Sequence, residues 1–217
     1  AAAKRQLGDD VDMTHFRPSY NPWDERLCAV PNGDLFKTLR RGEAEIVTDH
    51  IERFTETGIL LKSGKALEAD IIITATGLNV QMLGGVEGTI DGKPVEPRES
   101  LVYKGMMLRD VPNMALVFGY TNSSWTLKAD IASAYICRLL NYMDAEGLTV
   151  VTPEGDSDLT LADRSIMDAL ASGYVKRSSH KLPRQGRHHP WKGVNHYGKD
   201  KHILLEEPVE DGLLRFS

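Results

Sequence analysis

The sequence predicts an α/β fold, and three observations support this prediction. Residues 71–75 are continuously apolar and mostly β-branched, which is typical of a strand buried on both faces of a parallel sheet, and residues 114–119 have a similar character. A long helix is expected to begin within residues 121–126 and to run to about Met143. Residues 51–61 have the pattern of a hairpin, which indicates an antiparallel piece inserted into the fold.

The first elements are short. Residues 1–7 resemble the end of a helix, so we expect the sequence to be a piece of a longer protein. Residues 8–31 contain three prolines, which break helices, and this segment should be irregular. A short helix should follow, with Asn32 as its N-cap residue and Gly42 just past its end.

The next segment should be antiparallel. Residues 44–48 are expected to form a strand, and the hairpin of residues 51–61 should turn near Thr57 and Gly58. Ser63 and Gly64 predict a second turn.

Beyond the strand predicted at 71–75, residues 84–100 should form a loop with a small turn at Asp91 and Gly92. The helix after residue 121 has an apolar face at helical spacing. That predicted face consists of Leu127, Ile131, Ala134, Tyr135, Leu139 and Tyr142. Residues 149–164 should be an acidic surface connection, and the last 45 residues have no period strong enough to predict an element.

Composition excludes several protein classes. The chain has 217 residues, of which 41% are hydrophobic and 26% charged, so it can bury a core. No apolar run approaches the roughly 20 residues of a membrane span, and the first residues do not resemble a signal peptide. Cys28 and Cys137 form neither a disulfide framework nor a CxxC motif. A reducing, cytoplasmic location is therefore expected.

The charge is distributed unevenly along the chain. The net charge is −5, yet residues 175–205 hold eight Lys or Arg and one acidic residue, so the remainder is strongly acidic. An acidic chain is a poor candidate for nucleic-acid binding. The basic segment could face a phosphate-bearing cofactor, or it could be a solvated flank or a contact with another acidic domain.

The end of the predicted strand at Asp70–Gly77 is the first candidate site. A ligand that crosses the carboxyl end of a buried strand needs a close backbone approach, which Gly77 permits. The Thr76 hydroxyl could exchange a hydrogen bond with that ligand. The alternative is a plain core strand that ends in a turn glycine.

The beginning of the long helix is the second candidate site. The four small polar residues Thr121, Asn122, Ser123 and Ser124 lead into Trp125 and Thr126 of the expected first turn. A helix N-terminus presents free N–H groups and a partial positive charge, which together stabilise an anion. The alternative is ordinary N-capping by the serines.

Arg26 and a histidine group complete the candidates. Arg26 lies in an aromatic, proline-braced segment, so its guanidinium could stabilise an oxyanion, but from the residues alone a surface ion pair with Asp24 or Glu25 is the favoured explanation. Five histidines occur between residues 180 and 202, but their spacing matches no metal motif, and we expect no metal site. GxGxxG, GxxxxGK[ST] and GxSxG motifs are all absent from the sequence.

Three longer segments carry a family resemblance. They read HFRPSYNPWDERLCAVPNGDLF, ADIIITATGLNVQMLGG and YKGMMLRDVPNMALVFGYTNSSWTLKAD, and they resemble the C-terminal half of class B flavoprotein monooxygenases of the Baeyer–Villiger type. The resemblance extends over most of the chain. It implies a partial Rossmann-like fold that binds FAD and NADPH. It also implies that the N-terminal half of the enzyme, with both glycine motifs, is missing here.

The resemblance also implies roles for ranges and residues. Residues 1–75 would end the NADPH-binding domain, 76–150 would return to the FAD-binding domain, and 151–217 would form a C-terminal extension. The loop at 121–124 and the helix after it would point at the flavin, and Arg26 would stabilise a C4a-peroxyflavin.

The implied reaction is the oxygenation of a ketone, with thioether oxidation as a side activity. The alternatives are a flavin N- or S-monooxygenase without ester-forming activity, and a non-catalytic fragment that binds a nucleotide or a partner protein. The oligomeric state, including a homo-oligomer, is left open.

Overall fold

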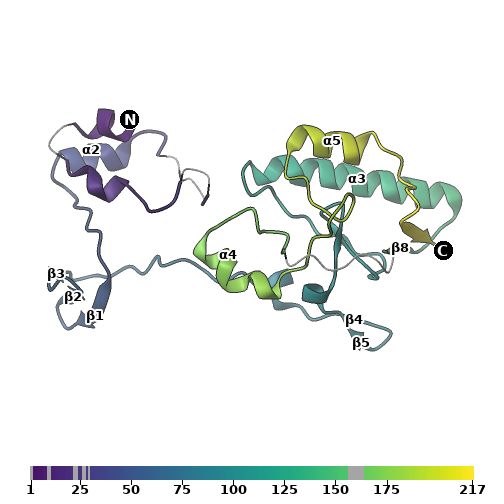
Figure 1. Ribbon diagram of the computed structural model, residues 1–217, viewed down its shortest axis with the longest axis horizontal. Coiled ribbons are helices and arrows are strands. Elements are labelled where there is room, and N and C mark those ends of the chain that lie inside the picture. Colours follow the sequence, from purple (N-terminus) through teal and green to yellow (C-terminus); the bar gives the residue numbers. More distant parts are fainter. Residues whose placement is uncertain (1, 9–10, 22–23, 26–27, 29, 156–163) are drawn as a thin grey trace. The chain divides into compact units, whose positions relative to one another are not determined.

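The computed structural model describes residues 2–8, 11–21, 24–25, 28, 30–155 and 164–217 (Figure 1). The chain divides into two compact units. The first unit consists of Ala1–Pro22 and Leu27–Gly77, and the second of Trp23–Arg26 and Leu78–Ser217. Each unit contains both helices and strands, which confirms the mixed α/β character that the sequence predicts.

The first unit begins with helical segments. They are α1 (Ala2–Leu7), the 3-10 helix η1 (Met13–Phe16) and α2 (Asp34–Arg40). Helix α1 packs against α2. Gly42 follows α2 in a left-handed conformation with φ 68°, as predicted. The predicted N-cap is wrong by one residue, because Gly33 rather than Asn32 occupies that position.

A three-stranded antiparallel sheet completes the first unit. Its strands are β1 (Ile51–Thr55), β2 (Gly58–Leu61) and β3 (Ala66–Glu68), in the order β1-β2-β3. The pairing of Thr55 with Gly58 leaves a two-residue turn, close to the predicted position. A side chain at Gly58 is excluded, because a Cβ atom would lie 1.9 Å from the carbonyl oxygen of Leu67. The predicted turn at Ser63 and Gly64 is also present.

Three predicted strands are not formed. Residues 44–48, 71–75 and 114–119 have no regular secondary structure. Ile71 and Ile73, expected in a core, expose 80% and 86% of their surface. A strand requires partners for its backbone N–H and C=O groups, and the part of the chain that the structure describes provides no ladder for these segments. Apolar character therefore identified segments suited to a sheet, but the neighbouring strands are absent from the described chain.

The second unit is built around α3 (Trp125–Glu146), which packs against α5 (Tyr197–Leu205) (Figure 1). Its paired strands are β4 (Thr89–Ile90) with β5 (Lys93–Pro94), β6 (Val102–Tyr103) with β7 (Met107–Leu108), and β8 (Val151–Pro153) with β9 (Leu214–Phe216). Its remaining elements are η2 (Met82–Gly85), η3 (Pro97–Glu99), α4 (Gly173–Ser178) and η4 (Ser179–Lys181). The predicted turn at Asp91–Gly92 joins β4 to β5.

Two predictions for this unit need correction. Strand β8 is buried, so the segment from residue 149 is not entirely a surface connection, while residues 156–163 lie outside the described residues. The last 45 residues, for which no element was predicted, contribute α4, η4, α5 and β9. These elements are too short, or too mixed in composition, to produce a clear period.

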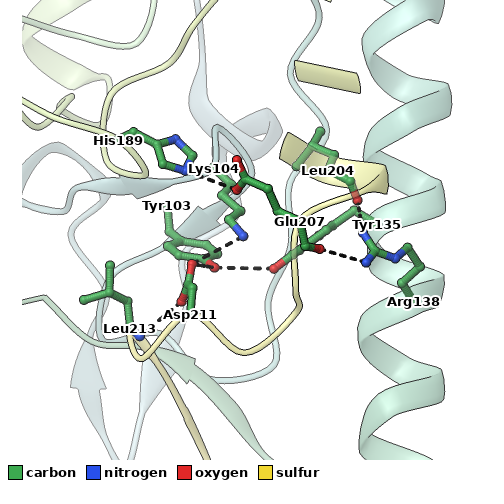
Figure 2. A network of polar contacts seen from close by, with 9 residues as sticks. All are labelled: Tyr103, Lys104, Tyr135, Arg138, His189, Leu204, Glu207, Asp211 and Leu213. Atoms are coloured by element: carbon green, nitrogen blue, oxygen red, sulfur yellow. Dashed lines mark hydrogen bonds and ion pairs between the residues drawn. The ribbon is translucent and has the colours of Figure 1, made fainter. Parts of the chain in front are cut away.

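The core of this unit joins α3 to the β6–β7 hairpin and the C-terminal segment. Trp191 and Tyr103 are both buried, with their ring centroids 5.6 Å apart. Figure 2 shows the polar part of this junction, where the Tyr103 hydroxyl donates to Asp211 Oδ2 at 2.6 Å and Lys104 Nζ lies 3.3 Å from the same oxygen. Burial raises the pKa of the Tyr103 hydroxyl above its usual value, so this group stays protonated as the donor.

The same view also shows hydrogen bonds that hold the C-terminal segment to α3. The guanidinium of Arg138 donates to the carbonyl oxygens of Leu204 and Glu207 (Figure 2). The segment after α5 is thereby fixed to the helix whose first turn is the candidate site.

Candidate cofactor-binding site at the beginning of helix α3

Helix α3 begins directly after the polar segment that the sequence singled out. Ser124 occupies the N-cap position with φ −60° and ψ 134°, but its side chain makes no capping hydrogen bond. Its hydroxyl instead lies 2.7 Å from Thr126 Oγ1. The side chains of residues 122–127 are exposed. The helix therefore begins at the surface of its unit, and its N-cap serine leaves the first-turn N–H groups to another acceptor.

Trp125 packs back over the chain that leads into the helix. A Cβ atom at Gly119 would lie 2.2 Å from the indole ring, so only glycine fits beneath this tryptophan. Half of the Trp125 side chain remains exposed. It also lines an apolar pocket of about 570 Å³ within the second unit. The other lining residues include Leu78, Val80, Leu116, Phe118 and Tyr174.

Thr121 is tied to a distant loop by two hydrogen bonds. Its backbone N–H donates to Asn195 Oδ1 at 3.2 Å, and Asn195 Nδ2 donates to Thr121 Oγ1 at 2.7 Å. Both residues line a second cavity of about 110 Å³. The position of the chain before α3 is thus set by a residue 74 positions later in the sequence.

A buried ion pair lies in the wall of the same cavity. Lys128 Nζ is 3.1 Å from Asp200 Oδ1, and the two side chains are only 10% and 6% exposed. The ammonium also lies 5.6 Å from the centroid of the Tyr120 ring. Burial lowers the pKa of Lys128, and the charge of Asp200 opposes that shift. Burial and Asp200 together raise the pKa of the Tyr120 hydroxyl.

The structure places the predicted site residues in different parts of the chain. Residues 121–126 lie together in the second unit. Thr76 and Gly77 lie at the end of the first unit, where Gly77 has a left-handed φ of 96° and the chain is not a strand. Arg26 lies outside the described residues. Two residues earlier in the sequence, the backbone carbonyl of Asp24 accepts a hydrogen bond from the N–H of Ala171 at 2.9 Å.

Sequence reasoning missed Asn195, Lys128 and Asp200. For Lys128 a signal existed, because it shares helical spacing with Ile131 and Tyr135 on the buried face of α3. The predicted apolar face included Leu127 instead, which is 40% exposed. A lysine at a core position of a helix indicates a buried partner, which is Asp200 here. Asn195 carried no comparable signal, because its partner is distant in sequence.

Three of the five histidines between residues 180 and 202 have polar side-chain contacts that give them a structural role. The ring of His196 accepts from the N–H of Lys199 at 3.4 Å, and so caps the beginning of α5. His202 Nδ1 lies 2.6 Å from Glu206 Oε2, and His189 Nε2 lies 3.6 Å from Glu207 Oε2. Among the described residues there is no group of three or more His, Cys, Asp or Glu arranged to hold a metal ion.

Comparison with known proteins finds FAD-containing monooxygenases among the relatives of this chain. AlmA of Acinetobacter baylyi, named as an FAD-binding monooxygenase, is 56% identical over 212 residues, which are 98% of this chain and 42% of AlmA. MymA of Mycobacterium tuberculosis, named as an FAD-containing monooxygenase, is 58% identical over 99% of this chain and 43% of its own length. The FAD-containing monooxygenase EthA of the same species is 53% identical over 99% of this chain and 44% of EthA.

The chain therefore spans less than half the length of the curated relatives it matches. No family model matches the sequence, and no solved structure does. Within the described residues, no helix is both long enough and apolar enough to cross a membrane.

Proposed function

We propose that this chain, which is homologous to FAD-containing monooxygenases over nearly its whole length, is the C-terminal portion of an FAD- and NADPH-dependent Baeyer–Villiger monooxygenase. Such an enzyme inserts one atom of O₂ beside the carbonyl of a ketone to give an ester or lactone. The second oxygen atom leaves as water, and NADPH supplies the two electrons. The identity of more than half the residues to relatives named for FAD and oxygenation is the observation that carries this proposal.

The residues at the beginning of α3 fit a flavin. FAD, when bound, stores the two electrons from NADPH and reacts with O₂. Its reduced ring carries negative charge, which a helix N-terminus stabilises. The N-cap Ser124 leaves the first-turn N–H groups for an outside acceptor, and this end of the helix is exposed. Thr121, Asn122, Ser123, Ser124, Trp125 and Thr126 would therefore hold the edge of the flavin ring.

Three other predicted residues have roles in the same proposal. Gly77, with its left-handed φ, would let the backbone pass close to the cofactor, and the Thr76 hydroxyl would bind it. Arg26 would hold a fixed positive charge where negative charge develops during oxygen transfer. A planar guanidinium spreads that charge and offers several donors, which a lysine ammonium does not.

The test uses a protein of the relatives' length that contains this chain, and its Arg26→Ala variant. The parent should convert a ketone to an ester, and the measured quantity is ester formed per NADPH consumed. Arg26→Ala should still oxidise NADPH, but more of the oxygen should appear as hydrogen peroxide, so the ratio falls. Arg26→Lys should restore little of it. The control is Arg53→Ala, which removes an exposed arginine of β1 whose ion pair is with the neighbouring Glu52.

The outcomes separate the rival functions. A parent that oxidises a thioether or an amine but never a ketone would be a flavin N- or S-monooxygenase. A parent without flavin absorbance would be a nucleotide- or partner-binding protein instead. An unchanged product ratio in Arg26→Ala would assign the role of Arg26 to another residue.

A further inference from the structure

We propose that Asn195 is a positioning residue for the flavin site, because it fixes the chain that leads into α3 and so aims the N-terminus of that helix. This inference rests on the proposed function, since it assumes that the flavin lies at the beginning of α3. Asn195 lies far in sequence from residues 121–126, which are the segment from which the sequence predicts this site.

The contact between Asn195 and Thr121 is specific in both directions. The carboxamide accepts from the Thr121 N–H at 3.2 Å and donates to Thr121 Oγ1 at 2.7 Å. Two bonds of opposite polarity to one residue fix its orientation as well as its position. Thr121 lies three residues before the N-cap Ser124, so a shift at Thr121 would reach the first-turn N–H groups directly.

The backbone of the loop suits this task. Asn195 has φ 52°, in the left-handed region that asparagine tolerates better than most residues. The next residue, His196, caps α5. Asp200, in the first turns of α5, forms the buried ion pair with Lys128. This short segment therefore contacts the chain on both sides of the α3 N-terminus. Asn195 contacts Thr121, which precedes the helix, and Asp200 contacts Lys128, which lies in its first turn.

Fixed donors are what a developing negative charge requires. Donors that are held in place before the reaction stabilise charge without a cost of reorganisation, and small misplacements are expensive in rate. If the amide of Asn195 were removed, α3 would still be held by Asp200, but the segment 121–124 could move. Loss of the amide should therefore change the reduction potential of the bound flavin more than it changes the stability of the fold.

The chain contains a close structural match for use as a control. Asn113 has φ 53°, and its side chain also makes two hydrogen bonds of opposite polarity. It donates to the carbonyl of Thr149 at 3.0 Å and accepts from the N–H of Val151 at 2.9 Å. Those contacts tie down the beginning of β8 rather than the residues before α3. A substitution of Asn113 should lower the stability of the fold by a similar amount and leave the reduction potential of the flavin unchanged.

The experiment compares Asn195→Gly with Asn113→Gly in a protein of the relatives' length, because glycine accepts the left-handed φ while losing the amide. The reduction potential of the bound FAD is measured in each, together with product formed per NADPH consumed. Asn195→Gly should weaken binding of reduced relative to oxidised flavin about tenfold, a shift of about −30 mV for two electrons. Its product ratio should fall. Asn113→Gly should match the parent in both measurements.

A second variant tests the pair itself. Thr121→Val removes the acceptor Oγ1 with little change of shape. It should lower the potential by itself, and it should lower the potential by less in the Asn195→Gly background, because the shared hydrogen bond is already lost there. It also carries the test if Asn195→Gly does not fold. A potential equal to that of the parent in Asn195→Gly, or in a folded Thr121→Val, would overturn the positioning role while the proposed function stands. A parent that binds no flavin would overturn both.

Discussion

Among single residues, Lys128 and Asp200 show how strongly burial controls the behaviour of a charge. Both side chains are almost completely buried, and they lie 3.1 Å apart. Burial lowers the pKa of Lys128 because it disfavours the ammonium, whereas Asp200 raises it by attraction. The pair is therefore favourable mainly because neither charge is left alone.

Burial of both charges predicts that single and double substitutions of this pair differ in their effect on stability. Asp200→Ala should destabilise the second unit by about 3–5 kcal/mol, because it leaves a buried ammonium uncompensated. Replacement of both residues, as Lys128→Met with Asp200→Leu, should cost much less. The measurement is urea denaturation of the 217-residue chain.

The matched control for this measurement is Glu154→Ala, which breaks an ion pair with Arg215 in the same unit. Those side chains are 67% exposed for Arg215 and 45% for Glu154, so solvent screens the pair and the denaturation midpoint should hardly move. A single Asp200→Ala variant as stable as the parent would contradict the argument from burial.

At the scale of elements, prediction succeeded where an element is determined locally. Helix α3, the β1–β2 hairpin and the Asp91–Gly92 turn follow from helical period and turn residues that are visible in the sequence. The segments 71–75 and 114–119 show the opposite case, because a strand also depends on what lies beside it. The sequence could indicate their apolar character but not the partners they need.

The candidate site also has a part that is determined locally and a part that depends on distant contacts. The polar residues 121–124 and the helix after them could be predicted, because they are adjacent in sequence. Asn195 could not be predicted, because its contact with Thr121 exists only after the C-terminal segment has folded back to α3.

The N-terminus of α3 permits a prediction that isolates individual N–H groups. Trp125→Pro removes one first-turn donor at a position where proline is tolerated, and Ser124 before it already has the extended conformation that proline requires. In the flavin-bound enzyme, losing a charge-assisted hydrogen bond worth ~1.5–3 kcal/mol should make the flavin potential roughly 30–65 mV more negative. Thr126→Pro removes the next donor, so the pair locates which N–H is used.

The controls for the proline variants keep the N–H and remove only the side chain. Trp125→Ala and Thr126→Ala should leave the potential close to that of the parent, with FAD still bound. If both proline variants kept the parent's potential within a few millivolts, α3 would be a scaffold helix, and its polar first residues would have no role at the flavin.

For the whole molecule, the main feature is a set of large apolar side chains that are exposed on its surface. Besides Ile71 and Ile73, Leu78 and Val86 expose more than half of their surfaces, at 58% and 72%. A chain of this composition can bury such residues, and its relatives are more than twice as long as the part that matches. We therefore expect that, in a protein of the relatives' length, such side chains of each unit pack against additional chain.

The last prediction concerns the 217-residue chain by itself. It should not retain stoichiometric FAD, because the GxGxxG motif that places a cofactor's pyrophosphate on a helix N-terminus is absent from its sequence. Its exposed apolar residues should also make it self-associate. Gel filtration with absorbance at flavin wavelengths tests both points, with a protein of the relatives' length as the flavin-binding control. A yellow, monomeric 217-residue chain would show that these residues bind flavin without additional chain, and that the exposed isoleucines need no partner.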